Sequence, residues 1–386
     1  QDDATGTLKA YYVFDAASGA GVVHYSYELK DNAAHAAGND TNDLVLPPLV
    51  LEVTDKDSQS ASGSVTITIV DDVPSAVVDT NSVVAGSYAP ITGDVRANDT
   101  QGADGAVVAG VAKGATNADL DDATTVAAAV QGTYGKLTVQ ANGSYSYQRD
   151  AGTAGGGTDV FTYTLKDGDG DLRHTTLTIT IDDFVPPAPV IPAAGGVTTT
   201  VYEAALGVRP GEPAGSNTSA TTETTSGTIT FVSKDGLSEV SLGGHVLGTA
   251  EAVLETPPPG ELQGYSTHAP LTGAGTIYYT YTLLDNTLVD PDSVSFAVVV
   301  KDLDGDLAPA GSLVINIVDD APTAVADTDT VTSGSYAAIT GDVRLFPPPG
   351  FGPILWGLYV RMGTGPTLDN AYRFQYQVST ANVTTP

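Results

Sequence analysis

Three short turns in this sequence carry aspartates at every second position. Asp167, Asp169 and Asp171 form one such turn, Asp302, Asp304 and Asp306 a second, and Asp55 and Asp57, followed by Gln59, a less complete third. This spacing places the carboxylates on one side of a tight turn, and small residues between them let the backbone fold around an ion. Calcium takes roughly six to eight oxygen ligands and so requires several converging carboxylates. The spacing therefore favours calcium.

Each acidic turn is followed by an alternating apolar strand and then by two adjacent aspartates. These acidic pairs are Asp71 and Asp72, Asp182 and Asp183, and Asp319 and Asp320. We call an acidic turn, its strand and its acidic pair a cassette. Each pair lies where the last strand of one domain is expected to pass into the next, so a cation bound there would tie two domains together.

Two other interpretations of the acidic turns must be compared with calcium binding. An EF-hand loop requires glycine at position six and glutamate at position twelve, where one turn has Leu172 and Thr178 and the other Leu307 and Leu313. This excludes an EF-hand. Aspartate and glycine are also ordinary turn formers on an acidic surface, and the sequence leaves this explanation open.

The charge balance excludes several classes of partner. The chain has 386 residues, of which 46 are Asp or Glu and 15 are Lys or Arg, for a formal net charge of -31. Nucleic acids and anionic membrane surfaces would be repelled. No apolar run approaches the roughly 20 residues of a membrane span, and the absence of cysteine excludes disulfides and thiolate metal sites. Because the chain begins with Gln1 and its single methionine is Met362, we expect it to be a piece of a longer protein.

Most of the remaining sequence predicts short strands. Apolar residues alternate with Ser or Thr in segments such as 65–69, 161–165 and 277–283, as expected of antiparallel strands buried on one face. Asn142-Gly143 predicts a tight hairpin turn. No segment predicts an amphipathic helix. The expected fold is all-β, with antiparallel β-sandwich domains arranged in a linear array.

Internal repeats divide the chain into four predicted parts. Residues 1–72 resemble the C-terminal half of a domain that appears whole at 184–320, since Tyr25–Asn32 matches Tyr279–Asn286. Residues 73–183 form a separate domain. At 321 the pattern of that domain restarts, but from Leu345 to Pro386 the sequence diverges and contains the only tryptophan, Trp356.

The other candidate residues indicate structural roles rather than ligand binding or catalysis. Alternate tyrosines on strands suit a core better than a sugar-stacking face; they are Tyr25 and Tyr27, Tyr145 and Tyr147, and Tyr279 and Tyr281. The five histidines show no zinc spacing and no Gly-x-Ser-x-Gly motif accompanies them. Gly155–Gly157 lacks the Lys-Ser/Thr of a phosphate loop. We therefore expect no enzymatic activity.

The sequence resembles two repeat types of bacterial surface proteins. Residues 79–183 resemble a VCBS-type repeat, through segments 93–100, 134–147 and 159–170. Residues 200–328 resemble the longer type I secretion target repeat, through segments 201–204, 226–231, 281–285 and 318–324. Together these segments are similar to the giant RTX-type adhesins that bacteria export by type I secretion.

This resemblance implies Ig-like or cadherin-like sandwiches with Ca²⁺ at or near the domain junctions. It also implies an extracellular place on the bacterial cell surface and a non-enzymatic role as a stalk in cell adhesion or biofilm formation. Possible partners are other copies of the chain, head-to-tail or lateral, and surface glycans or other cells. Two alternatives remain: a subunit of a self-assembling filament or surface layer, and a glycan-binding module centred on 345–386.

Overall fold

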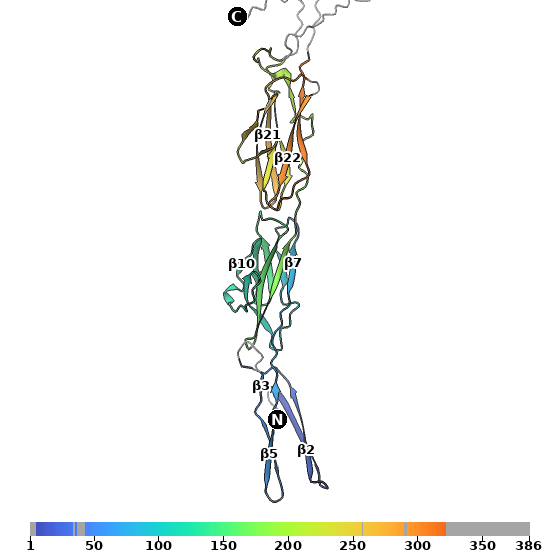
Figure 1. Cartoon of the computed structure of the whole chain (residues 1–386), viewed down its shortest axis with the longest axis vertical. Coiled ribbons are helices and arrows are strands. Elements are labelled where there is room, and N and C mark those ends of the chain that lie inside the picture. The colour runs from blue at the N-terminus through green and yellow to red at the C-terminus, as the bar shows by residue number, and fades with distance from the viewer. Residues whose placement is uncertain (1–4, 34, 37–42, 257, 289–291, 322–386) are drawn as a thin grey trace, which may run out of the picture.

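The computed structural model describes residues 5–33, 35–36, 43–256, 258–288 and 292–321. These residues form two hairpins followed by two β-sandwiches in a row along one axis (Figure 1). Apart from strands they contain only two 3₁₀ turns, Ala123–Thr125 and Glu203–Ala205, and no α-helix. This confirms the predicted all-β fold. Among the described residues no helix is long and apolar enough to cross a membrane. The divergent segment 345–386 lies outside the described residues.

The first sandwich packs two four-stranded sheets, ordered β10-β11-β12-β8 and β7-β14-β13-β9. Its strands are β7 (Asp79–Val83), β8 (Ile91–Asp94), β9 (Ala106–Lys113), β10 (Ala129–Gln131), β11 (Gly135–Val139), β12 (Ser144–Arg149), β13 (Thr158–Asp167) and β14 (Leu172–Ile181). Gln140 to Gly143 join β11 to β12, and Gly143 adopts a φ of +86°. The hairpin predicted from Asn142-Gly143 is therefore present.

Apolar and polar residues alternate strictly along the strands that form the core of the first sandwich. On β14, Leu177, Ile179 and Ile181 are at most 1% exposed, while the threonines between them face outward. Tyr145 and Tyr147 on β12 are 7% and 0% exposed, which confirms the core position predicted for this pair. Burial of each large apolar side chain contributes about 1.5–3 kcal/mol, so the alternating strands themselves account for the packing of the two sheets.

The Tyr163 hydroxyl lies between two carboxylates in the first sandwich, 2.8 Å from Oδ2 of Asp79 and 3.0 Å from Oδ2 of Asp99. Burial raises the pKa of Asp79 to about 6, although the hydrogen bond from Tyr163 opposes the shift. A carboxyl whose pKa is higher in the folded than in the unfolded chain stabilises the fold below the unfolded value and loses that contribution as pH rises through the folded value.

Stability of the first sandwich should therefore fall as pH rises from about 4 to about 7. We expect the free energy of unfolding of Asp79→Asn to fall by about 2 kcal/mol less than that of the wild type over this pH range, because the amide does not titrate. Denaturant unfolding of both proteins across this pH range measures the difference between them. Parallel pH profiles for the two proteins would contradict the assignment to Asp79.

The second sandwich has a five-stranded sheet, β15-β23-β22-β17-β18, facing a four-stranded sheet, β16-β21-β20-β19. Its strands are β15 (Thr200–Tyr202), β16 (Thr224–Val232), β17 (Glu239–Leu242), β18 (His245–Val246), β19 (Ala252–Glu255), β20 (Gly260–Ala269), β21 (Ala274–Leu283), β22 (Asp292–Lys301) and β23 (Gly311–Val318). Tyr279 and Tyr281 are 2% and 1% exposed, as predicted for core residues. In both sandwiches the first strand pairs in parallel with the last: β7 with β14, and β15 with β23.

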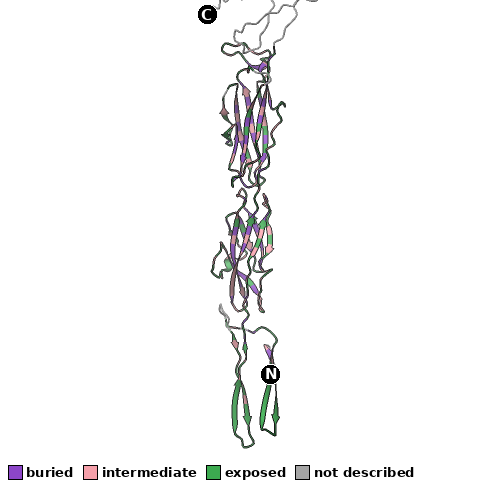
Figure 2. Ribbon diagram, turned by 45° about the vertical axis from the view of Figure 1, so that its right-hand side comes forward, coloured by how far each residue is buried: buried purple, intermediate pink, exposed green. Residues whose placement is uncertain are grey.

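The N-terminal hairpins, residues 5–69, differ from the sandwiches because their strands pair only two by two. The strands are β1 (Gly6–Asp15), β2 (Ala20–Leu29), β3 (Leu44–Val45), β4 (Leu49–Thr54), β5 (Ser60–Val65) and β6 (Thr68–Ile69). Figure 2 shows exposed residues along both hairpins, whereas buried residues line the inside of each sandwich. Tyr25 is 55% exposed, so the core position predicted for it is wrong: no described strand covers its face of β2.

Candidate metal centres

The acidic turns are the tips of hairpins that close with the same backbone geometry. In the β13–β14 turn, Oδ1 of Asp167 accepts hydrogen bonds from the N–H groups of Gly170 (3.0 Å) and Asp171 (2.7 Å). In the β22–β23 turn, Oδ1 of Asp302 accepts from Gly305 (3.1 Å) and Asp306 (2.7 Å). The first aspartate thus uses one oxygen to shape its turn, and its second oxygen remains for a ligand.

Glycine occupies the left-handed position of the two complete turns. Gly170 and Gly305 adopt φ angles of +114° and +109°, a left-handed region that strains residues with a Cβ atom. The third turn, between β4 and β5, differs in detail: Oδ1 of Asp55 accepts from the N–H of Asp57 (2.9 Å) and of Gln59 (2.8 Å), and Ser58, with a φ of +67°, takes the place of the glycine. Its two aspartates are exposed at the tip of their hairpin and join no carboxylate cluster within the described residues.

The acidic turn and the acidic pair of one cassette lie at opposite ends of a sandwich. They are joined by β14, whose 10 residues span about 33 Å at 3.3 Å per residue. A single ion therefore cannot bind both. Instead, the turn of each sandwich meets the acidic pair of the preceding cassette, so each cluster forms at a junction between consecutive parts of the chain.

The first junction cluster lies between the N-terminal hairpins and the first sandwich. Carboxylate oxygens of Asp71, Asp169 and Asp171 lie within 4.8 Å of one another, as do those of Asp104, Asp167 and Asp169. Asp169 belongs to both groups, so two neighbouring cation positions would share it. Asp104 comes from the loop between β8 and β9, and the linker before β7 supplies Asp71.

The carboxylates of the first junction cluster fit a bound cation. Asp167 is 7% exposed, and neither its Oδ2 atom nor Oδ1 of Asp169 has a hydrogen-bond partner within the described residues. Burial and the neighbouring Asp169 raise the pKa of Asp167 to about 6. A buried carboxylate oxygen without a partner is costly, and a divalent cation would both satisfy it and neutralise the repulsion.

The second junction cluster lies between the two sandwiches. Oxygens of Asp183, Asp304 and Asp306 lie within 4.8 Å of one another. Asp302 at the base of the turn is fully buried, with Oδ2 unpartnered within the described residues. Burial, followed by the neighbouring carboxyl group of Asp304, raises the pKa of Asp302 to about 7, and burial together with Asp304 also raises the pKa of Asp183. These side chains, too, match the oxygen-rich ligand set of calcium.

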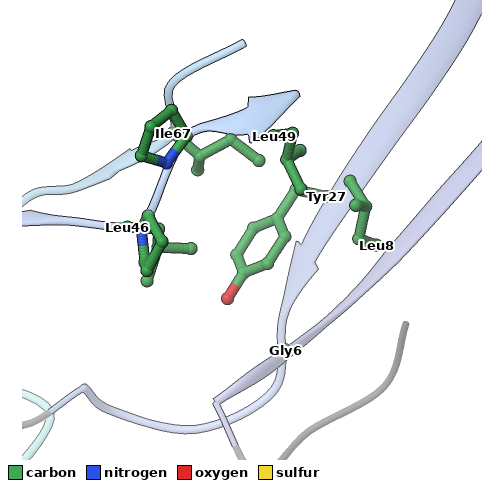
Figure 3. A pocket seen from close by; sticks show the side chains of 8 residues that line it. Gly6, Leu8, Tyr27, Leu46, Leu49 and Ile67 are labelled. Carbon is green, nitrogen blue, oxygen red and sulfur yellow. The ribbon is translucent and has the colours of Figure 1, made fainter. Parts of the chain in front are cut away.

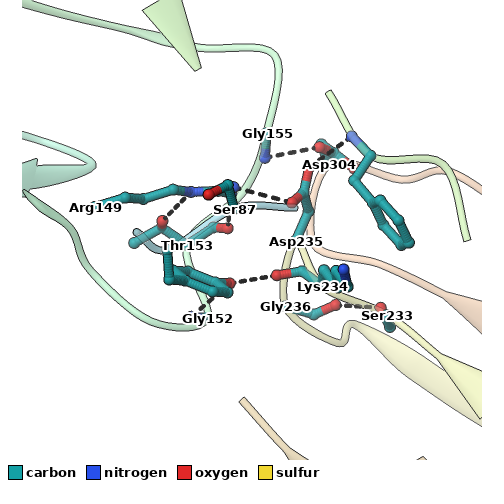
Figure 4. A network of polar contacts seen from close by, with 12 residues as sticks. Ser87, Arg149, Gly152, Thr153, Gly155, Ser233, Lys234, Asp235, Gly236 and Asp304 are labelled. Atoms are coloured by element: carbon teal, nitrogen blue, oxygen red, sulfur yellow. Dashed lines mark hydrogen bonds and ion pairs between the residues drawn. The ribbon is translucent and has the colours of Figure 1, made fainter. Parts of the chain in front are cut away.

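The second junction also has direct contacts between the sandwiches (Figure 4). Arg149, at the end of β12, places Nη1 3.1 Å from Oδ1 of Asp235, which lies between β16 and β17, and both side chains are 0% exposed. Oδ2 of Asp235 accepts from the N–H of Phe184 at 2.8 Å. The Tyr88 hydroxyl donates to the carbonyl of Lys234, and the N–H of Gly155 donates to Oδ2 of Asp304 at 3.0 Å. This junction is therefore held by protein contacts in addition to any ion.

Contacts at the first junction are of a different kind. Asp72 accepts from the N–H of Ala103 at 2.9 Å, and the N–H of Asp71 donates to Asp43 at 3.2 Å. Among the ion pairs of the described residues, Arg149 with Asp235 is the one in which both side chains are fully buried. At the first junction Nδ1 of His35 lies 3.7 Å from Oδ1 of Asp71, and these side chains are 7% and 3% exposed.

Besides Asp55 and Asp57, four of the predicted ligands lie outside both clusters: Asp72, Asp182, Asp319 and Asp320. Asp182 is exposed, and its N–H bonds to the carbonyl of Val83. Asp319 and Asp320 lie at the far end of the second sandwich, where Oδ2 of Asp320 accepts from the N–H of Ser216 at 2.7 Å. Beside them lies Glu203, 1% exposed, whose pKa is raised by burial and by Asp319.

Sequence reasoning missed Asp104, Asp235 and Glu203. Asp104 sits in a loop of the form Gly-Ala-Asp-Gly and Asp235 in Lys-Asp-Gly, which are ordinary turn sequences. Glu203 follows a short strand, and Oε2 of this residue has no partner within the described part of the chain. Only the fold brings these side chains to the ends of the sandwiches.

The fold and these clusters define tandem β-sandwiches with carboxylate groups at their junctions. Residues 71–183 match the family model of the bacterial cadherin-like domain. This range begins at Asp71 of the first junction cluster and ends at Asp183 of the second. The first sandwich is therefore similar to the bacterial cadherin-like domain over its whole length.

Solved cadherin structures are also similar to the chain. Protocadherin PcdhgB3 EC1-4 is 13% identical, with 83% of this chain and 66% of that one covered and a TM-score of 0.25. Human CDH23 EC21-23 is 17% identical, with 68% of this chain and 77% of that one covered and a TM-score of 0.22. Mouse PcdhgC3 EC1-3 is 11% identical, with 81% of this chain and 89% of that one covered and a TM-score of 0.23. No curated protein matches the sequence. With TM-scores this low, the fold assignment rests on the sheets themselves and on the family match.

Proposed function

We propose that this chain is a calcium-stabilised, non-enzymatic stalk. The observation that carries the proposal is that each junction cluster combines one aspartate of the acidic pair of one part of the chain with the acidic turn of the next. In the first cluster Asp71, Asp104, Asp167, Asp169 and Asp171 would hold calcium. In the second, Asp183, Asp304 and Asp306 would do so, with Asp302 at the base of the turn.

The chain's own residues explain why a cation would stiffen the stalk. Two unit charges 4 Å apart repel by about 1 kcal/mol in water and by about 4 kcal/mol near a protein surface. Three carboxylates within 4.8 Å of one another therefore push the linker away from the turn. A bound divalent cation reverses the sign of this interaction, because it attracts carboxylates from both sides of the junction.

The biological setting that fits best is the bacterial cell surface. The cadherin-like domain at 71–183, the end-to-end order of the sandwiches and the likeness to type I-secreted RTX adhesins support a spacer in attachment or biofilm formation (Figure 1). In such a spacer the rod holds an adhesive region away from the cell, and stiffness is the property that calcium would supply.

Small-angle scattering and thermal melting of the full chain test this proposal. In millimolar calcium we expect an extended particle with a higher melting temperature, and in excess chelator a shorter mean length and a lower melting temperature. The Asp57→Ala variant is the matched control, because its aspartate occupies the same type of turn without a cluster. If shape and melting are the same with calcium and with chelator, the acidic clusters are ordinary turns and the calcium proposal fails.

One observation favours a second candidate, a subunit of an extracellular filament. The N-terminal hairpins carry sheet edges that no described strand covers, and such edges accept strands from other chains. Fibres that form from the purified chain and depend on these hairpins would support the filament. A chain that stays monomeric at high concentration would exclude it.

A further inference from the structure

The N-terminal hairpins repeat one half of the second sandwich. Residues 6–32 align with residues 260–286 without a gap, so β1 and β2 correspond to β20 and β21. Gly6 and Gly260 occupy the same position, and a Cβ atom at either one would lie 2.4 Å from a tyrosine hydroxyl, that of Tyr27 or of Tyr281. Strand β4 corresponds to the end of β22, because both lead into an acidic turn.

In the second sandwich one continuous segment covers these strands. Strand β16 pairs along β21, with Gly227 opposite Tyr279, Ile229 opposite Ile277 and Phe231 opposite Gly275. After a turn, β17 pairs along β22, with Val240 opposite Val300 and Leu242 opposite Val298. Residues 224–242 therefore close both sheets and complete the core between them.

The corresponding edges of the N-terminal hairpins have no such cover. Within the described residues β2 pairs only with β1, and β4 only with β5. Tyr25 is 55% exposed, whereas its equivalent Tyr279 is 2% exposed; Val53 is 68% exposed, whereas Val300 is 1% exposed. Leu29 is 49% exposed, against 1% for Leu283. The exposed apolar side chains thus correspond to side chains that, in the complete copy, share one core with Ile229, Phe231, Val240 and Leu242 of the segment 224–242.

A glycine on β2 indicates which side chain is missing. In the second sandwich a Cβ atom at Gly275 would lie 2.1 Å from Cζ of Phe231, so the phenylalanine ring requires glycine there. Gly21 holds the same position in β2, but a Cβ atom at Gly21 would meet nothing closer than the Val13 carbonyl oxygen at 3.6 Å. The space next to Gly21 can therefore accommodate an aromatic ring.

The hairpins also leave space where they converge (Figure 3). A cavity of about 250 Å³ lies between them, with Leu8 and Tyr27 on one side and Leu46, Leu49 and Ile67 on the other. Its lining side chains come from both hairpins and include leucine, isoleucine, proline and tyrosine. The two hairpins alone do not fill the core that their inward-facing residues define.

We propose that the N-terminal hairpins bind an extended polypeptide segment with the pattern of residues 224–242. The segment adds one strand to β2, with glycine opposite Tyr25 and phenylalanine opposite Gly21, then turns and adds a second strand to β4 beside Val53. Main-chain hydrogen bonds give the affinity in this mode of recognition, and the side-chain pockets give the specificity. This inference is independent of calcium binding, because it uses none of the clustered carboxylates.

Binding of a labelled synthetic peptide to the full chain tests the proposal. The peptide has the sequence of residues 222–243, and its fluorescence anisotropy is followed as the chain is added. We expect saturable binding and slower amide exchange in β2 and β4, but not in β8. Exchanging the phenylalanine for aspartate (Phe231→Asp in the peptide) should weaken binding at least about tenfold.

The Gly21→Leu variant of the chain separates this site from non-specific adhesion. Its side chain has room in the hairpin by itself but occupies the place of the phenylalanine ring, so binding should again weaken at least about tenfold. Three results would overturn the proposal: no binding up to about 1 mM peptide, equal binding to Gly21→Leu, or dimers of the chain alone that Gly21→Leu abolishes. The last result would assign these edges to a second copy of the chain.

Discussion

Replacing Arg149 with methionine is expected to lower the free energy of unfolding by about 3–5 kcal/mol. Arg149 and Asp235 are both fully buried at the second junction, and their side chains are 3.1 Å apart. Removing the guanidinium leaves a carboxylate whose pKa is already raised by burial and which Arg149 otherwise stabilises in its charged form. Denaturant unfolding in saturating calcium measures the loss, and scattering should show a bend between the sandwiches.

Two further variants make this result specific. Arg149→Met combined with Asp235→Leu should recover most of the lost stability, because no buried charge is then left without a partner. Lys136→Met removes an exposed ion pair with Asp150 and should change stability by less than about 1 kcal/mol. An Arg149→Met chain that unfolds at the wild-type denaturant concentration would show that the contact does not hold the junction.

Replacing Asp169 with alanine should strongly weaken calcium binding at the first junction. Asp169 contributes to both groups of carboxylates there, so its loss leaves each group with two members. We expect calorimetric calcium titration to show an affinity at least about tenfold weaker at this junction, and the second junction to retain its own binding.

Asp182→Ala is the matched control for this experiment. Asp182 also belongs to a cassette, but it is exposed and joins no cluster within the described residues. Its substitution should leave the titration unchanged. The same loss of calcium in both variants would mean that net negative charge, not the clustered geometry, attracts the ion.

The sequence predicted the acidic turns well because their geometry is local. Alternating aspartates with glycine at the left-handed position determine the hydrogen bonds within each turn, and Asp167 and Asp302 accept them in the same way. Which pair meets which turn could not be predicted, since it depends on the strand length between them. Arg149 and Asp235 are far apart in sequence, and only the stacking of two sandwiches brings them together.

Tyrosine positions illustrate a second limit of sequence reasoning. The alternation at Tyr25 and Tyr279 is the same, and it correctly indicates which face of each strand is apolar. Burial requires in addition the neighbouring strand and the facing sheet, and Tyr279 has both, because β16 pairs beside it and the second sheet closes its core. A pattern on one strand carries no information about the presence of its partner, so Tyr25 is exposed.

The parallel pairing of first and last strands determines how this chain bears mechanical load. Tension along the rod pulls the start of β7 and the end of β14 in opposite directions, which shears the five residue pairs between them. Evenly spaced bonds of a parallel ladder are loaded together in shear, rather than opened one after another. In the second sandwich the corresponding patch, between β15 and β23, has three pairs, so each carries a larger share of the force.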